Sequence, residues 1–416
     1  MLADCEIKEI EIMDILEDCR PPVTVFCGFL GVGKTTLLRH LLGQAATAGR
    51  EGGAARWAAV VNDVAAVNID GSLVRAEAAE QRALGTSGAA EVVELGNGCV
   101  CCSGADDLGE AIARLADRGP YDHIWVETSG VADPRGVATL FTRKNPFGRS
   151  LADRARLAAL VTVIDVVAFA EEAAKAGGRG RSVAGSGQRP VFELMLEQIE
   201  CADVVVLNQC DRVELGGADL ARAEALVAGL NARAELVRTE HGQISAEFFT
   251  ERMRFDGGAT LSAARWVREL NRVAVDRTGI AVKPQTIFGT PRHEAKYGIT
   301  SFVYRARRGF DGQRLRDLFV GGLPGVLRAK GFFWTKEMPD EMGFVSVAGG
   351  IIRWEALSVW WAARIAMGRA TLADRPESVV ANWAEPQGDR RQEIVLIGVD
   401  MDQAALFKAL DQCLAS

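Results

Sequence analysis

Residues 23–36 have the sequence Val-Thr-Val-Phe-Cys-Gly-Phe-Leu-Gly-Val-Gly-Lys-Thr-Thr, and this stretch decides the fold. A short apolar run is followed at once by Gly28-x-x-x-x-Gly33-Lys34-Thr35, with a third glycine at Gly31. Glycines let the backbone turn tightly so that its N–H groups surround phosphate, and the start of a following helix adds positive potential. The stretch therefore predicts a strand, a phosphate-binding loop and a helix.

Within this loop each polar residue has an expected role. Lys34 would reach the β- and γ-phosphates, and the Thr35 hydroxyl would ligate Mg²⁺. Thr36 joins them in the expected nucleotide-binding set, together with the three glycines.

A second apolar run, Ile124–Glu127, ends in a carboxylate and is followed by Thr-Ser-Gly130. In P-loop proteins an acidic residue at this point faces the water shell of Mg²⁺, and a nearby glycine senses the γ-phosphate. We therefore expect Glu127 and Gly130 to lie beside the end of the triphosphate.

A third apolar run, Val204–Leu207, ends in Asn208-Gln209-Cys210-Asp211. GTPases carry Asn-Lys-x-Asp after such a strand, and the Asp carboxylate accepts from guanine N1–H and the 2-amino group. Asn208 is expected to brace the loop. Gln209 replaces the lysine whose stem normally packs on the base, so we expect guanine preference with weakened affinity or relaxed selectivity.

Outside these motifs, apolar runs rich in Val, Ile and Leu alternate with Ala- and Leu-rich stretches of helical character. Strands that are apolar throughout are buried on both faces, so the alternation predicts an α/β fold: a P-loop NTPase domain with a mostly parallel, doubly wound sheet. The expected strands are 23–27, 58–62, 91–95, 124–127, 160–165 and 204–208. The expected helices are 34–42, 108–115, 191–199 and 220–230.

The alternation fades near residue 250, and a different pattern begins after Tyr297. Strands are expected at 299–306, 326–335, 344–348 and 393–398, and helices at 313–319 and 403–413, which predicts a smaller C-terminal α+β domain. The glycine-rich stretch 177–187 is expected to be a flexible loop. The expected regions are an acidic extension (1–20), a P-loop domain (21–250), a linker (251–296) and the C-terminal domain (297–416).

The segment Gly96-Asn-Gly-Cys99-Val-Cys101-Cys102 places three thiols close together, directly after an expected strand. Thiolates are soft ligands for Zn²⁺, Cu⁺ or iron–sulfur chemistry, and three of them leave a tetrahedral site one ligand short, as transfer of an ion requires. Because loops after parallel strands gather at one edge of the sheet, the cluster is expected near the nucleotide. Buried core cysteines or reactive redox thiols are the alternative interpretations.

Other titratable residues have simpler interpretations. Cys5 and Cys19 lie in the N-terminal extension, which is expected to be a short surface helix, where they could add metal contacts. His123 precedes an expected strand and is expected at the surface; a residue that binds a metal ion or supports its ligands is the alternative. Four further cysteines lie in apolar or helical contexts and are expected to be small core residues: Cys27, Cys201, Cys210 and Cys413.

The composition narrows the function classes. The 416-residue chain has a formal net charge of −7, which argues against a general binder of nucleic acid or of an anionic membrane. It contains no apolar run long enough to span a bilayer, and its acidic N-terminus lacks the positive region of a signal peptide. We therefore expect a cytoplasmic protein whose nine cysteines are thiols or metal ligands.

This combination of motifs resembles the CobW-like family of P-loop GTPases. The resemblance implies a GTP-hydrolysing metallochaperone that carries an ion on the three clustered cysteines and delivers it to a client metalloenzyme recognised by the C-terminal domain. Zinc is the commonest cargo in the family; a similar branch activates iron-type nitrile hydratase, so Fe²⁺ is the alternative. The matching segments are 28–36, 96–102, 127–134, 208–211, 296–304 and 388–393.

Several positions depart from the family pattern. Residues 61–70 resemble the family's switch segment, in which Asp63 is expected to help Glu127 organise the Mg²⁺ shell, but Ala66 stands where an acidic residue is usual. The chain has only four histidines, so bulk zinc buffering is not expected. Together with Gln209, these differences favour a specialised client.

The expected catalytic set for hydrolysis of GTP to GDP is Lys34, Thr35, Asp63 and Glu127. Intrinsic turnover should be slow, because no glutamine or arginine finger can be assigned. A non-enzymatic nucleotide-binding scaffold for a metalloenzyme is the alternative of another class. A small-molecule kinase is disfavoured because a three-cysteine loop has no role in phosphoryl acceptance. The motifs do not indicate an oligomeric state.

Overall fold

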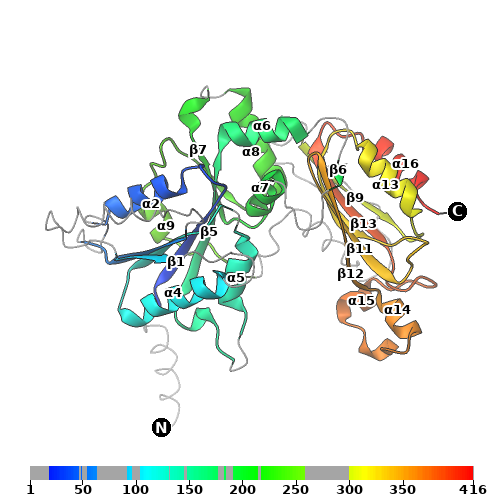
Figure 1. The fold of residues 1–416 in the computed structure, drawn as a ribbon, viewed down its shortest axis with the longest axis horizontal. Helices are drawn as coiled ribbons and strands as arrows, with labels where there is room; N and C mark the ends of the chain where they lie inside the picture. Colours follow the sequence, from blue (N-terminus) through cyan, green and yellow to red (C-terminus); the bar gives the residue numbers. More distant parts are fainter. Residues whose placement is uncertain are drawn as a thin grey trace, which may run out of the picture. The chain divides into compact units, whose positions relative to one another are not determined.

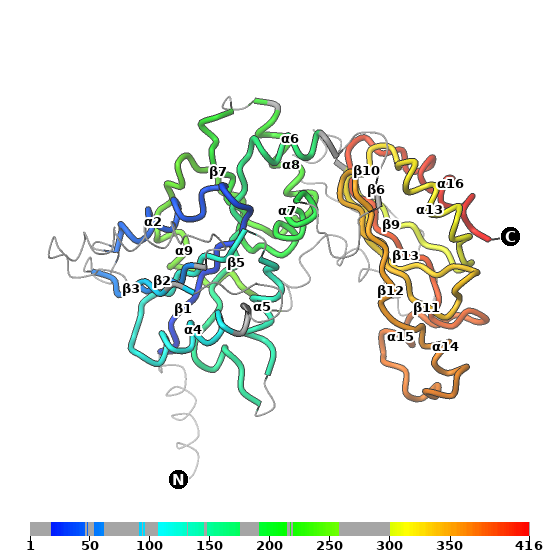
Figure 2. The backbone as a smooth tube through the Cα atoms, in the orientation of Figure 1, coloured from blue at the N-terminus to red at the C-terminus, as the bar shows by residue number. Residues whose placement is uncertain are grey.

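The computed structural model describes residues 18–45, 48, 54–62, 91–95, 104–130, 132–144, 148–176, 182–183, 191–213, 217–257 and 299–415 (Figures 1 and 2). Within these ranges the strands form two sheets. One has the order β3-β2-β4-β1-β5-β7-β8, and the other has the order β6-β12-β11-β10-β13-β9. The predicted fold class is confirmed: a seven-stranded sheet with helices, and a separate C-terminal sheet with its own helices.

The seven-stranded sheet is parallel in the pairings of β1 with β4, β2 with β3 and β4, and β7 with β5 and β8. β4 and β7 are buried along their whole length, which is why their sequences show continuous apolar runs rather than alternation. Its strands are β1 (Pro22–Cys27), β2 (Trp57–Asn62), β3 (Glu91–Leu95), β4 (His123–Glu127), β5 (Arg156–Asp165), β7 (Val204–Asn208) and β8 (Glu235–Arg238).

Two of the helices that accompany this sheet lie outside the predicted set and begin at aspartate caps. Asp133 accepts from the N–H of Arg135 and is followed by Pro134 at the first helical position. Asp165 accepts from the N–H groups of Val167 and Ala168. The α-helices are α2 (Lys34–Gly43), α4 (Gly104–Arg118), α5 (Pro134–Thr142), α6 (Val166–Ala176), α7 (Val191–Glu200), α8 (Ala218–Leu230) and α9 (Glu247–Thr250).

The chain forms two compact units. The first comprises the chain up to Cys27, then 34–160 and 243–255; the second comprises 28–33, 161–242 and 256 onward. The core of the first unit contains an aromatic cluster. The Trp57 and Trp125 rings lie 5.3 Å apart edge to face, and Phe26 packs against Phe249 at 5.6 Å.

The C-terminal sheet of the second unit is antiparallel except at one edge, where Ser182 and Val183 pair in parallel with Ile351 and Ile352. The expectation of a loop over 177–187 is therefore wrong at 182–183. The strands are β6 (Ser182–Val183), β9 (Ile299–Ala306), β10 (Val326–Phe333), β11 (Glu341–Ala348), β12 (Ile351–Val359) and β13 (Gln392–Val399). The helices are α13 (Gly312–Gly321), α14 (Trp361–Ala366), α15 (Glu377–Ala381) and α16 (Gln403–Gln412).

Alternate residues of this sheet serve two cores, as the two-residue period of a strand requires. On β13, Ile394 and Leu396 pack in a core with residues of α13 and α16. The intervening Val395 and Ile397 pack with residues of α6, α7 and α8. The C-terminal sheet is thus covered on both faces.

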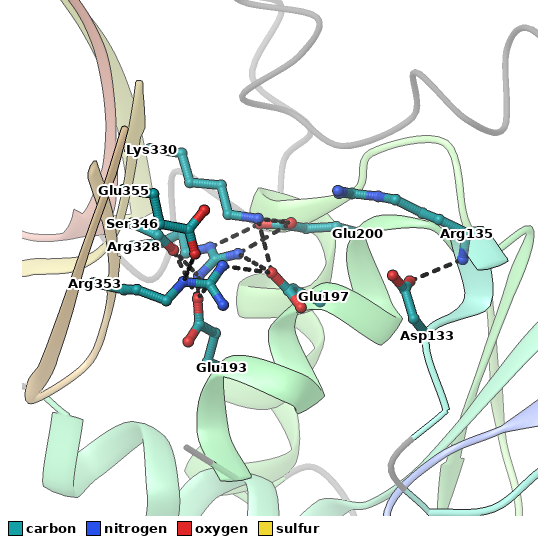
Figure 3. Close-up of polar contacts among 10 residues, drawn as sticks. All are labelled: Asp133, Arg135, Glu193, Glu197, Glu200, Arg328, Lys330, Ser346, Arg353 and Glu355. Carbon is teal, nitrogen blue, oxygen red and sulfur yellow. Dashed lines mark hydrogen bonds and ion pairs between the residues drawn. The ribbon is translucent and has the colours of Figure 1, made fainter. Parts of the chain in front are cut away.

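The face toward α7 also holds a buried ion network (Figure 3). Glu193, Glu197 and Glu200 recur along α7 at helical spacing and so share one side of it. They meet three cations of the sheet, namely Arg328 and Lys330 on β10 and Arg353 on β12. This network ties the helix that precedes β7 to the C-terminal sheet by charge as well as by apolar contact.

No described helix is long and apolar enough to cross a membrane.

Candidate nucleotide-binding site

The loop 28–33 of the second unit has a backbone that requires glycine. Gly28, Gly31 and Gly33 have φ values of 142°, 80° and 97°. A Cβ on Gly28 would lie 2.3 Å from the carbonyl oxygen of Val163, and one on Gly33 would lie 2.3 Å from Nδ2 of Asn208. Both close approaches exclude any side chain, so the glycines follow from packing as well as from the turn.

Asn208 connects this loop to the turn that follows β8. Its Nδ2 donates to the carbonyl oxygen of Val32 at 2.8 Å, and its Oδ1 accepts from the N–H of Gly242 at 3.1 Å. The side chain is buried, so both bonds are shielded from water. The contacts are those of a residue that braces the loop.

The neighbouring residues form the exposed part of this arrangement. Gln209 has a left-handed backbone (φ 63°), and its Nε2 lies 3.5 Å from the carbonyl oxygen of Gly31. The Asp211 side chain is 33 % exposed, with His241 Nε2 3.9 Å from its Oδ2. A carboxylate in this position has two acceptor oxygens available to a ligand with paired N–H donors.

Cys210 lies in the same turn but faces the core. Its thiol donates to the carbonyl oxygen of Leu207 at 3.2 Å, and burial raises the pKa of the thiol. A protonated, buried thiol is a poor metal ligand. The prediction that Cys27, Cys201, Cys210 and Cys413 are core residues is confirmed, since all four are buried, whereas Cys19 is exposed.

The first unit holds the residues predicted to meet the phosphates and Mg²⁺. The Thr35 hydroxyl donates to Oε1 of Glu127 at 2.7 Å, and both Glu127 and Lys34 are buried. Thr128 ties the end of β4 to β1, because its N–H and its hydroxyl both donate to the carbonyl oxygen of Phe26. The carboxylate that accepts from Thr35 is therefore held at a defined position.

This pair of oxygen donors fits Mg²⁺. A hydroxyl that gives its proton to a carboxylate keeps its lone pairs for a cation, and hard oxygen ligands are those Mg²⁺ prefers. Thr35 would hold the ion, and Glu127 would orient that hydroxyl and the ion's water shell. Thr36 is exposed, and Gly130 is partly buried.

His123 corrects the sequence prediction of a surface residue. It is 1 % exposed, its Nε2 lies 2.8 Å from the Thr24 hydroxyl, and its ring packs against Trp125 at 4.1 Å. Burial lowers the pKa of the imidazole to about 3, so it is neutral in the folded protein. A strand-start position is often solvated, but here β1 and β2 flank β4 and exclude water.

Other predicted site residues lie outside the described residues: Asp63, Ala66, Cys5 and the cluster Cys99, Cys101 and Cys102. In the part of the chain that the structure describes, no group of three His, Cys, Asp or Glu side chains could hold a metal ion.

Two residues that contact the candidate site were absent from the sequence prediction. Arg212 bonds to Oε1 of Gln209 and to Oδ2 of Asp165, the latter at 3.2 Å. Asp165 ends β5, beside the strand that carries the guanine motif. The feature of the sequence that could have identified Asp165 was its position as a polar residue at the end of a buried strand.

Comparison with known proteins places these features in a family. The CobW/HypB/UreG nucleotide-binding domain matches residues 22–238, more than half of the chain, and the cobalamin synthesis protein CobW C-terminal domain matches residues 299–414.

Individual relatives agree with this match. The chain is 32 % identical over 404 residues to zinc-regulated GTPase metalloprotein activator 1 of Dictyostelium discoideum, covering 94 % of this chain and 79 % of that protein. It is 34 % identical over 234 residues to zinc chaperone CobW of Pseudomonas aeruginosa, covering 54 % and 57 %. It is 26 % identical over 334 residues to zinc chaperone YjiA of Escherichia coli, covering 78 % and 85 %. The phosphate-binding loop, the two matched domains and the extent of these similarities show that the chain belongs to the CobW/HypB/UreG family of nucleotide-binding proteins.

Proposed function

We propose that the protein is a GTPase metallochaperone, which binds Mg²⁺ and GTP, hydrolyses the nucleotide to GDP and delivers Zn²⁺ to a client metalloenzyme. The observation that carries the proposal is the framework around Asn208, which links a phosphate-binding loop to a turn that presents the Asp211 carboxylate. Relatives named as zinc chaperones and as a GTPase metalloprotein activator support the same function.

The proposed chemistry uses residues of both motifs. Lys34 neutralises charge on the β- and γ-phosphates, and the Thr35 hydroxyl binds Mg²⁺ while Glu127 and Asp63 orient its surroundings. Bound Mg²⁺ would supply charge stabilisation to the transferring phosphoryl group. Asp211 accepts from guanine, and Gly130 contacts the γ-phosphate. Turnover should be slow without a client, because no described residue is placed as a glutamine or arginine finger.

Zn²⁺ is the proposed cargo of Cys99, Cys101 and Cys102, with Fe²⁺ as the alternative. The segment that carries these cysteines leaves the sheet at Leu95, the last residue of β3. β2 pairs in parallel with both β3 and β4, and Leu95 and Glu127 end the strands on its two sides. Two strand spacings amount to about 10 Å, so the cysteine segment begins close to the carboxylate that holds Thr35.

This proximity supports a coupling between nucleotide and cargo. A γ-phosphate that reorders the segments after β2 and β4 would also change how three thiolates converge on an ion. Zinc affinity should therefore differ between the GDP-bound protein and the protein bound to a non-hydrolysable GTP analogue. Equal affinities would remove the coupling from the proposal.

The proposed regions of the chain are the extension 1–20, the P-loop domain 21–250, the linker 251–296 and the C-terminal domain 297–416. We assign client recognition to the C-terminal domain. We propose that the protein acts in the cytoplasm. The protein has no proposed nucleic-acid or membrane partner.

The test combines turnover, metal content and partner capture. Wild-type protein should hydrolyse GTP over multiple turnovers and co-purify with zinc, Lys34→Ala should lose hydrolysis, and Cys101→Ser with Cys102→Ser should lose zinc but retain GDP binding. Nucleotide binding without hydrolysis would select the scaffold alternative instead. Iron in place of zinc, together with co-isolated nitrile hydratase, would select the activator branch.

A further inference from the structure

Gln209 leaves the guanine motif without a cation at its second position, yet a cation lies three residues further along the same turn. We propose that Arg212 supplies to the bound base the positive charge that Gln209 lacks, while Gln209 retains the contact with the phosphate-binding loop. Two residues would then share the role that one lysine has in the usual motif. The inference rests on the proposed GTP binding and names a residue that contributes to the affinity of that site.

The local backbone brings the two side chains together. Residues Cys210–Arg212 form a short 3₁₀ helix, and the N–H of Arg212 donates to the carbonyl oxygen of Gln209 at 3.1 Å. This backbone hydrogen bond keeps Gln209 and Arg212 close to each other. Nη1 of Arg212 accordingly donates to Oε1 of Gln209, whose Nε2 points to the carbonyl oxygen of Gly31.

Asp165 holds the same nitrogen of the Arg212 guanidinium. Its Oδ1 accepts from the N–H of Val167 at 2.9 Å and of Ala168 at 3.1 Å, which holds the carboxylate at the first turn of α6. Its Oδ2 accepts from Nη1 of Arg212 at 3.2 Å. Only 14 % of the Asp165 side chain is exposed, so the surrounding protein fixes the position of the carboxylate that holds Arg212.

Arg212 nevertheless keeps a free surface. Its side chain is 52 % exposed, and its two side-chain contacts with described residues both use Nη1. A planar guanidinium held at one nitrogen can offer its face to a purine ring, and it stacks on aromatic systems better than an ammonium does. Arg238, which ends β8, is instead held by Glu224 through two bonds.

Stacking and hydrogen-bond recognition make different predictions. Every purine presents a π face, so a stacked guanidinium should strengthen binding of guanine and adenine nucleotides alike. Asp211, by contrast, recognises the N1–H and 2-amino group that only guanine presents together. Loss of Arg212 should therefore weaken binding without changing the ratio of GDP to ADP affinity, whereas loss of Asp211 should collapse that ratio.

The experiment is a set of equilibrium titrations of the full-length protein with GDP and ADP. Arg212→Ala should raise the Kd for both nucleotides by about tenfold. Adding Gln209→Lys to that variant should restore the GDP affinity, because a lysine at position 209 returns the cation. Arg222→Ala, which removes an exposed arginine of α8, is the matched control and should bind as wild type.

The outcomes distinguish failure of the proposed function from failure of the role proposed for Arg212. If wild-type protein binds no GDP, the proposed function fails. If it binds GDP and Arg212→Ala binds equally well, the role of Arg212 is overturned. A loss that Gln209→Lys does not restore would also overturn it, since that result assigns Arg212 to holding the turn in shape.

Discussion

The buried ion network allows a quantitative prediction about the C-terminal sheet (Figure 3). Glu200 is fully buried; its carboxylate lies 2.9 Å from Nε of Arg328 and 3.3 Å from Nζ of Lys330, both of which are also buried. The perturbation is Glu200→Gln, which removes one negative charge with little change in volume.

The magnitude follows from the charge balance. Four members of the network are buried, namely Glu193, Glu200, Arg328 and Lys330, and their charges balance, whereas Glu197, Arg353 and Glu355 lie at its more exposed edge. Glu200→Gln therefore leaves one unit of positive charge buried. Removing one partner from a buried ion pair costs about 3–5 kcal/mol, most of it from the charge left behind. A second change, Lys330→Met, restores neutrality and should recover a large part of that loss.

The matched control is an exposed pair of similar geometry. Nη1 of Arg154 lies 2.6 Å from Oδ2 of Asp117, but the two side chains are 47 % and 55 % exposed. Asp117→Asn should cost no more than about 1 kcal/mol, because water screens such pairs. The comparison therefore isolates burial as the cause of the difference.

Native-state hydrogen exchange read at α7 and β10 is the appropriate assay, because it reports the local free energy of opening in a protein with more than one cooperative unit. Equal losses for Glu200→Gln and Asp117→Asn would refute the reasoning. So would a double variant with Lys330→Met that is less stable than Glu200→Gln alone, since the cost would then lie in lost packing and not in uncompensated charge.

Three further predictions concern the first unit and the phosphate-binding loop. The pKa of His123 falls to about 3 on folding, so between pH 6.5 and 3 the unfolded chain binds a proton that the folded chain does not. The free energy of unfolding should therefore be highest above pH 6.5 and about 2 kcal/mol lower at pH 5. When unfolding is followed against pH, His123→Gln should abolish this loss, and the exposed control His40→Gln should retain it. Gly33→Ala should weaken GDP binding by at least about tenfold, because its Cβ would displace Asn208. Gly136→Ala has open space around its Cβ and should bind GDP as the wild type does. Equal GDP affinities of the two variants would contradict the argument from close approach. Glu127→Gln should raise the Mg²⁺ concentration for half-maximal GTP hydrolysis about 10- to 100-fold, measured by phosphate release, and an unchanged requirement would show that this carboxylate does not orient Thr35.

Local patterns predicted most elements correctly. The strands Glu91–Leu95, Val204–Asn208 and Ile299–Ala306 have the predicted limits, because each is an apolar or alternating run ended by polar or glycine residues. The strand β5 begins at Arg156, four residues before the predicted start at Leu160, since its first half is rich in alanine and leucine and carries no β-branched residue. β12 was missed because its exposed second half includes Leu357, which hides the alternation.

The motifs themselves were visible because each depends on neighbours in the chain. A phosphate-binding loop needs its glycines, lysine and threonine in series, and Asp211 follows directly from β7. By contrast, Arg212 became a candidate only when the structure placed it against Gln209 and Asp165, and Asp165 lies 47 residues away in the sequence.

The sequence alone therefore determined the nucleotide-binding fold class and the residues proposed to contact phosphate, Mg²⁺ and guanine, since these are encoded by periodicity and short spacing. Only the tertiary structure decided that Asn208 bonds to the carbonyl oxygen of Val32 across 176 residues, that His123 is buried, and that Arg328 meets Glu200 across 128 residues. Such contacts depend on which surfaces pack together, and packing joins segments whose separation along the chain leaves no local pattern.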